Sequence, residues 1–152
     1  MKKKIIFAMA SLILSSGAAF ADKSDITGLW HHMDDRLGTS KALVEIRKEA
    51  NGTYTGTVVK VISRPGYTPK EFCVNCPAPY TDKPMLGLSV VTQLKQDKDN
   101  ANQYVGGKVL DPLSGKIYSI KAKLNPSGNR LQMRGYIGVS ALGRTQTWIR
   151  AQ

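Results

Sequence analysis

The amino-acid sequence predicts an all-β fold, an eight-stranded antiparallel up-and-down barrel. Three observations lead to this prediction. From residue 26 onward no helical periodicity persists over three turns, β-rich segments recur at nearly regular spacing, and turn-forming residues separate most of them. A two-sheet β-sandwich is the alternative. The barrel is favoured because closure removes the two exposed edge strands of an open sheet.

Each strand is expected where β-branched and aromatic residues lie between clusters of Gly, Pro, Asn and Asp. The first strand precedes the turn Asp34-Asp35-Arg36-Leu37-Gly38, and Asn51-Gly52 is a hairpin signal between the second and third strands. A long irregular segment follows the third strand, and polar turns separate the others. The expected strands are 26–33, 42–48, 53–62, 86–94, 103–110, 116–124, 130–137 and 144–150.

Two of these segments alternate clearly between apolar and polar residues. In 116–124, Ile120 and Leu124 alternate with lysines, and in 130–137, Leu131, Met133 and Ile137 alternate with polar residues. Such strands have one buried and one solvated face. The segments 58–62 and 86–91 are instead apolar on both faces, so we expect the long loop between them to cover part of the outer wall.

The first twenty-one residues have the pattern of a secretory signal peptide. Three lysines precede the apolar run 5–14, and Ala19-Phe20-Ala21 offers small residues to a signal peptidase. Cleavage is expected after Ala21, which leaves one domain, 22–152. The tri-lysine start is typical of bacterial export, so a periplasmic or secreted location is predicted.

The net charge of +11 falls to +8 when the three leading lysines are removed. The remaining basic residues are spread along the chain without a run, which favours a solvated surface. No nucleic-acid partner is predicted for an exported protein. Contact with anionic lipid headgroups or acidic glycans is the functional alternative.

Cys73 and Cys76 are the only cysteines, and in an oxidising compartment they are expected to form a disulfide that shapes the loop 63–84. A thiol–disulfide centre and a metal site are the alternatives. The residues Pro77-Ala78-Pro79 cannot begin the helix that usually activates such a thiol. A metal site would need His31 or His32, whose side chains point to opposite faces of a strand. No metal or cofactor is predicted.

Catalytic motifs are not found. Ser114-Gly115-Lys116-Ile117 lacks the first glycine and the final hydroxyl residue of a phosphate-binding loop, and 138–143 does not match a nucleophile elbow. No catalytic residue is therefore predicted, and a non-enzymatic protein is favoured.

A family resemblance rests on motifs spread over the chain. Gly28-Leu29-Trp30 and Arg150 resemble the first-strand and last-strand residues that close a lipocalin barrel. The larger set resembles the bacterial exported family called domain of unknown function 2147. It comprises Cys73-Val74-Asn75-Cys76, Lys83-Pro84, Leu86-Gly87-Leu88, Gly106-Gly107-Lys108, 111–118, 134–138 and 143–150. The resemblance implies a small lipocalin-like barrel with no established activity, closed by Gly28, Trp30 and Arg150.

The favoured function is binding or carriage of a small apolar or amphipathic molecule inside the barrel. His32 shares strand parity with Trp30, so both are expected to face inward. The alternatives are a structural or interaction module without a ligand, and a Cys-x-x-Cys thiol–disulfide or metal-binding protein. The interior residues expected to contact a ligand are Trp30, His32, Leu88, Val90, Ile120, Met133 and Ile137.

Overall fold

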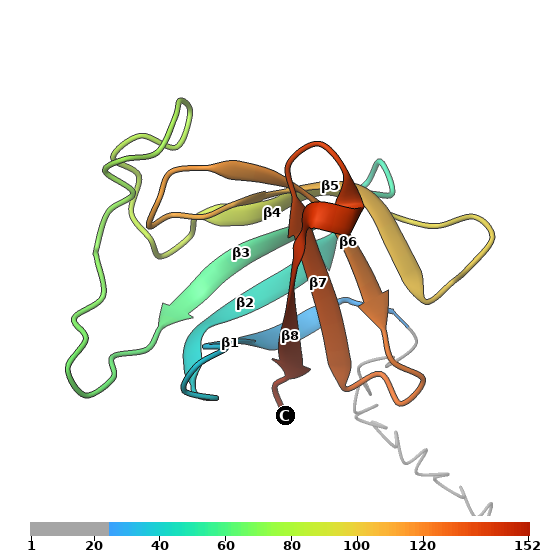
Figure 1. Ribbon diagram of the computed structural model, residues 1–152, viewed down its shortest axis with the longest axis horizontal. Coiled ribbons are helices and arrows are strands. Elements are labelled where there is room, and N and C mark those ends of the chain that lie inside the picture. Colours follow the sequence, from blue (N-terminus) through green and yellow to red (C-terminus); the bar gives the residue numbers. More distant parts are fainter. Residues whose placement is uncertain (1–24) are drawn as a thin grey trace, which may run out of the picture.

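The computed structural model describes residues 25–152, and the predicted signal peptide lies outside them. The described chain is all β apart from one short 3-10 turn, η1, at Ser140–Leu142 (Figure 1). Its strands are β1 (Gly28–Met33), β2 (Ser40–Lys48), β3 (Tyr54–Val61), β4 (Ser89–Gln96), β5 (Gln103–Leu110), β6 (Ile117–Leu124), β7 (Arg130–Tyr136) and β8 (Arg144–Arg150).

The strands form a closed barrel in which each strand pairs antiparallel with the next and β8 returns to β1. This topology confirms the predicted barrel rather than the sandwich. The closing seam aligns Trp30 with Arg150 and His32 with Trp148. All eight expected strands exist, although β4 begins three residues later than expected. Gly87, with φ of +84°, forms a turn there, and its N–H donates to the Val58 carbonyl.

The two ends of the barrel differ in their connections. Three short polar turns, 49–53, 97–102 and 125–129, lie at one end, here called the closed end. The opposite, open end carries the turns 34–39 and 111–116, the loop 137–143 and the long loop 62–88, which extends to the left in Figure 1. Every connection from an odd-numbered to an even-numbered strand is therefore at the open end.

The interior of the closed half is filled by large side chains. Tyr54 and Tyr104 meet edge to face with ring centroids 5.3 Å apart, an arrangement that aromatic pairs prefer. The other fully buried residues of the strands include Trp30, Val44, Ile46, Val91, Leu94, Ile120, Leu124 and Leu131.

Packing is equally close halfway along the barrel. A Cβ added to Gly107 would lie 2.7 Å from Leu94 Cδ1 and 2.8 Å from Ile120 Cγ1. A Cβ added to Gly56 would lie 3.0 Å from Val91 Cβ. A side chain at Gly107 would overlap its neighbours, and one at Gly56 would make unusually tight contacts, because neighbouring side chains already fill the space.

A disulfide constrains the long loop, which packs against the β5–β6 turn. Cys73 and Cys76 form a disulfide with a Cα–Cα separation of 5.4 Å, and the Cys73 N–H donates to the Lys83 carbonyl. The loop backbone at Asn75 lies so close to Gly115, in the β5–β6 turn, that no side chain fits there. Leu88, the last residue of the loop, packs in the core, but Val59 and Leu86 stay exposed, so the expected covering of the outer wall is only partial.

Candidate functional site

Arg150 closes the barrel at its closed end. Its guanidinium lies 4.3 Å from the Trp30 ring centroid and donates three hydrogen bonds of 2.6 Å, to the carbonyls of Gly128, Thr27 and Asp25. Burial lowers the pKa of Arg150. Gly28, at φ of +118°, leaves room for this group, since a Cβ there would lie 3.1 Å from Arg150 Nη1. The structure thus brings together the three residues expected to close the barrel.

Trp30 belongs to this closure and has no exposed surface. Its indole N–H donates to the Ile26 carbonyl over 2.9 Å. The residue is inside the barrel as expected. However, Arg150 packs on its ring and the Ile26 carbonyl accepts its indole N–H, so Trp30 has no exposed surface for a ligand to contact.

His32 lies nearer the open end, half-buried, on the same face as Trp30. Its ring centroid is 5.3 Å from that of Trp148, and its Nε2 is 3.1 Å from Gln146 Oε1. The Gln146 amide nitrogen faces Asp35 Oδ2 at 3.3 Å, and Arg144 donates to the same oxygen at 2.7 Å. Because the amide nitrogen donates to Asp35, the amide oxygen accepts from His32 Nε2–H.

The environment of His32 favours the uncharged imidazole. Burial is the main cause, nearby Lys41 adds to it, and together they lower the pKa of His32 to about 4. Hydrogen bonding to Gln146 and the charges of Asp35 and Asp111 oppose this shift. At neutral pH the site therefore offers a neutral hydrogen-bonding ring on an aromatic surface.

This shift predicts a loss of stability in mild acid. Because the folded pKa of about 4 lies below the ordinary value of 6.5, the unfolded chain binds more protons between these values. The stabilisation from His32 is complete above pH 6.5 and disappears as the pH falls through about 4. We expect a loss of about 3 kcal/mol across this window, measured by urea unfolding. His32→Gln should flatten the pH dependence, and an unchanged slope in that variant would contradict the assignment.

His31 takes the opposite face of β1, as strand parity predicts. Its Nδ1 lies 3.0 Å from Ser40 Oγ. The two histidines therefore do not converge on one site. Among residues 25–152, no group of three or more His, Cys, Asp or Glu side chains is arranged to hold a metal ion.

The other residues expected in the interior divide into three groups. Ile120 and Met133 are buried inside the barrel. Leu88 and Val90 are buried where the long loop enters β4. The prediction for Ile137 is wrong, because this residue is 67% exposed. Strand β7 ends at Tyr136, and Gly138, with φ of +76°, turns the chain into the β7–β8 loop.

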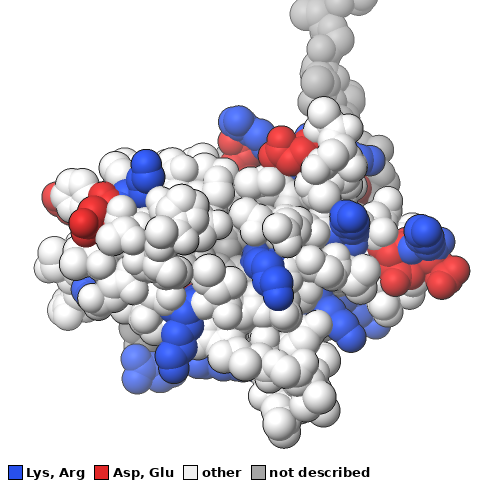
Figure 2. All heavy atoms as spheres, turned by 90° about the horizontal axis from the view of Figure 1, so that it is seen from above, with Lys and Arg blue, Asp and Glu red and all other residues white. Residues whose placement is uncertain are grey.

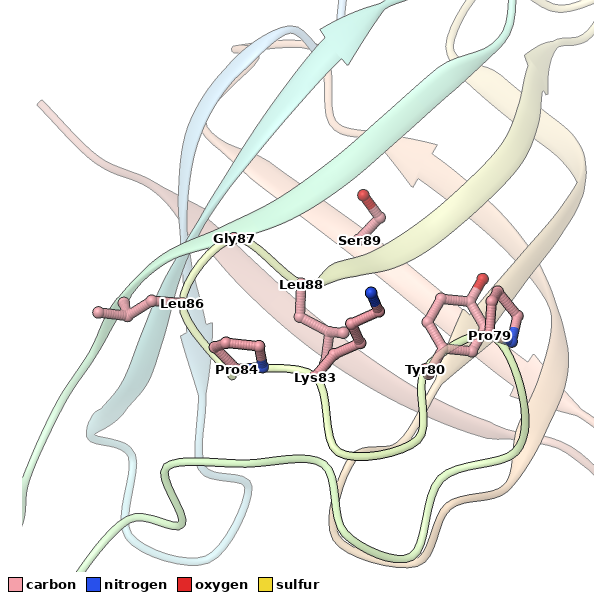
Figure 3. Close-up of a pocket in the computed structure, with 8 residues that line it drawn as sticks. All are labelled: Pro79, Tyr80, Lys83, Pro84, Leu86, Gly87, Leu88 and Ser89. Carbon is pink, nitrogen blue, oxygen red and sulfur yellow. The ribbon is translucent and has the colours of Figure 1, made fainter.

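Two pockets lie outside the barrel interior. The larger, about 280 Å³, lies between the long loop and the start of β4 (Figure 3), and the smaller, about 180 Å³, lies on the outer wall of β6–β8. Leu88 is the only predicted site residue that lines either pocket. In Figure 3, Leu86 points away from the other lining residues, which include Lys83, Tyr80 and Pro79.

An ion pair joins two loops of the open end. Arg64 of the long loop contacts Asp34 at 2.6 Å, with both side chains nearly buried. Asp34 also accepts the backbone N–H groups of Arg36 and Leu37. These donors, Arg64 first, hold the pKa of Asp34 far below its usual range. Arg64 in turn lies 4.6 Å from the Tyr67 ring centroid, so the pair fixes the β1–β2 turn against the long loop.

Exposed large apolar side chains concentrate at the open end. Apart from Leu29 and Val59, all those found among residues 25–152 lie in its turns and loops or at the first residue of β6. They are Leu37, Tyr67, Phe72, Val74, Leu86, Leu113, Ile117, Ile137, Val139 and Leu142. The open end is therefore apolar at its rim, whereas the closed end is polar.

Sequence reasoning found His32 but missed its partners Gln146, Trp148 and Asp35. Alternation along 144–150 places Gln146 and Trp148 on the face of Arg150, and this signal could have identified both. The contact with Asp35 depends on how the β1–β2 turn folds, for which the sequence carries no local pattern.

The comparisons with known proteins agree with this architecture. The family model described as "Uncharacterized protein conserved in bacteria (DUF2147)" matches residues 28–150. The chain belongs to the DUF2147 family. It is also similar to a solved structure of protein HP1028 from the human pathogen Helicobacter pylori, which is described as belonging to the lipocalin family. That match has a TM-score of 0.68 and 23% identity and covers 84% of each chain, so it shows the lipocalin-like fold of this DUF2147 member.

No curated protein matches this DUF2147 member. Within residues 25–152, no helix is long and apolar enough to cross a membrane.

Proposed function

We propose that this DUF2147 protein acts in the periplasm, or as a secreted protein, and binds a small apolar or amphipathic molecule at the open end of its barrel. The observation that carries the proposal is His32, a neutral imidazole that faces inward beside Trp148. The sequence of residues 1–21 supports the location.

The inward-facing residues around His32 support a site at this end. Ala42 and Val61 pair with each other beside His32, and Val109 pairs with Tyr118 on β5 and β6. All four are half-buried, whereas the large inward residues of the closed half are buried. The layer formed by Gly107, Leu94 and Ile120 is closely packed.

The chemistry of this shallow site fits a ligand with an apolar body and one polar group. Small barrels either fill their interior or hold one small ligand, and we place the guest at the half-buried inward residues of the open end. Trp148 and the aliphatic residues would contact the apolar body, and His32 would hydrogen-bond the polar group. Arg144 and Gln146 both donate hydrogen bonds to Asp35. These contacts fix the Gln146 amide group that faces His32.

A titration with a fluorescent fatty acid tests the proposal on the chain from residue 22. We expect saturable binding at one site per chain. In His32→Ala the dissociation constant should rise about tenfold, which corresponds to one lost hydrogen bond of about 1.4 kcal/mol. The matched control is His31→Ala, on the outer face, with a change of less than about twofold. Equal losses in both variants would contradict the proposed site.

A second candidate function is a structural or interaction module of the cell envelope without a ligand. The close packing around Gly107 and the apolar rim favour it. Absence of saturable binding by folded protein in the same titration would select this function over the first.

A thiol–disulfide role has less support. Cys73 is completely buried and Cys76 is 5% exposed, and disulfide exchange requires an attacking thiolate to reach a sulfur atom. Mass spectrometry of freshly purified protein tests this point. A stable disulfide without bound zinc argues against both the redox and the metal-binding alternatives.

A further inference from the structure

The positive charge of the barrel is distributed unevenly along the chain. Residues 25–102 contain ten basic and nine acidic residues, whereas residues 103–152 contain eight basic residues and one acidic residue, Asp111. Strands β5 to β8 therefore carry nearly all of the net charge of the described barrel. In the view of Figure 2, acidic side chains lie at the margins, and lysine and arginine side chains also stand in the middle of the face.

Much of this charge lies on one outer wall. Ile120, Ala122, Leu131 and Met133 are buried, so the residues that alternate with them on β6 and β7 point outward. Pairing places Lys121 beside Arg134 and Lys123 beside Gln132, and Lys108 of β5 donates to Ser119 on the outer face of β6. We call this surface the cationic wall, and it comprises Lys108, Lys121, Lys123, Arg130 and Arg134.

Carboxylates do not neutralise this wall. Within residues 25–152, strands β5 to β8 contain no acidic residue, and Asp111 lies in the β5–β6 turn, where it accepts from Ser114 and Leu113. The ion pairs of the described chain involve neither Lys123 nor Arg130. Both side chains are exposed and available to an anion.

A pocket lies within the wall. Its volume is about 180 Å³, and its lining combines two cations with amide and hydroxyl groups and one apolar ring. Ligand pockets for drug-sized molecules are larger, about 300–1,000 Å³, so this pocket fits a single small unit of a longer ligand. The lining residues are Lys123, Asn125, Pro126, Arg130, Gln132 and Thr147.

We propose that the cationic wall binds an acidic polysaccharide, with one sugar unit in this pocket. Lys123 and Arg130 contact a sugar carboxylate, while Gln132 and Thr147 hydrogen-bond hydroxyl groups. The wall favours a glycan over a bilayer because the large exposed apolar residues that could enter a membrane lie chiefly at the open end. This site is separate from His32 and does not depend on the function proposed for the open end.

Anisotropy of a fluorescein-labelled oligogalacturonate, added to the chain from residue 22, tests the proposal. We expect saturable binding that weakens as salt is added, because the contacts are solvent-exposed charges. The double variant Lys123→Gln/Arg130→Gln should bind about tenfold more weakly. The matched control Lys60→Gln/Lys95→Gln removes two exposed cations from β3 and β4 and should change affinity by less than about twofold.

Two further measurements separate the pocket from general charge attraction. Thr147→Val keeps the charge and should weaken binding about threefold, and neutral dextran should not compete. Equal weakening in the two double variants, or no binding at low salt, overturns the proposal. Binding to vesicles containing anionic phospholipid without binding to oligogalacturonate also overturns it and assigns the wall to a membrane surface. Circular dichroism checks that each variant is folded.

Discussion

Arg150→Ala is expected to lower the free energy of unfolding by about 3–5 kcal/mol, more than any other exchange considered for this barrel. The guanidinium donates to the carbonyls of Gly128, Thr27 and Asp25, each over 2.6 Å. Hydrogen bonds with a charged partner contribute more than neutral ones, about 1.5–3 kcal/mol each, although water recovers part of this at a half-buried site.

The loss would also remove the side-chain contacts by which Arg150 joins three parts of the closed end. Arg150 belongs to β8, Thr27 and Asp25 precede β1, and Gly128 lies in the β6–β7 turn. The alanine would uncover the Trp30 ring and remove a cation–π contact of about 0.5–2 kcal/mol. Because β1 and β8 form the closing seam, we expect the whole barrel to be destabilised rather than one turn.

Urea unfolding measures this effect, with two comparison variants. Arg47→Ala removes an arginine that is 73% exposed and pairs only with Glu45, so a change below about 1 kcal/mol is expected. Arg150→Lys keeps the charge but loses the planar set of donors, and should lie between the two. If Arg150→Ala were no more harmful than Arg47→Ala, the closure would not depend on this arginine.

The fold was predictable because the information for it is local. In β6 and β7, apolar and polar residues alternate because every second side chain is buried in the interior. Turn-forming residues mark the ends of nearly every strand. The prediction failed where a strand was extended by pattern alone. Ile137 continues the alternation of Leu131 and Met133, yet Gly138 turns the chain immediately after it. Leu86 continues the apolar pattern of β4, yet Gly87 forms a turn.

The candidate site was only partly predictable because its contacts are distant in sequence. His32 was identified by parity with Trp30, but its contact with Gln146 spans the β1–β8 seam. The docking of the disulfide loop depends on the approach of Asn75 to Gly115. Nothing near Cys73 or Cys76 in the sequence specifies that surface, so the sequence predicted the disulfide but not where the loop would pack.

Gly107→Ala is expected to cost about 2–3 kcal/mol, because it places a methyl group in an occupied interior. The new Cβ would lie within 2.8 Å of both Leu94 Cδ1 and Ile120 Cγ1. Both side chains are fully buried, so each would have to shift within the packed interior. Gly107 is not in a left-handed conformation, so the cost would come from packing rather than from backbone strain.

Gly135 provides a matched control at the same level of the barrel. Ile120 pairs with Gly107 on one side and with Gly135 on the other. At Gly135 a Cβ would meet its nearest neighbour, Tyr118 Cβ, at 3.8 Å, an ordinary contact. Gly135→Ala should therefore be neutral or stabilise the protein by up to about 1 kcal/mol. Thermal and urea unfolding compare the two variants directly.

The stabilities of Gly107→Ala and Gly135→Ala also indicate how far a ligand can extend into the barrel interior. If Gly107→Ala is costly and Gly135→Ala is not, the space beside β5 is filled and the space beside β7, on the side of Tyr118, accepts added atoms. A guest would then rest above Ile120 and next to His32, and Gly135→Ala should alter fatty-acid affinity without lowering stability. If both variants were neutral, the middle of the barrel would have room for an added methyl group, and a ligand could pass below Ile120 toward the closed end.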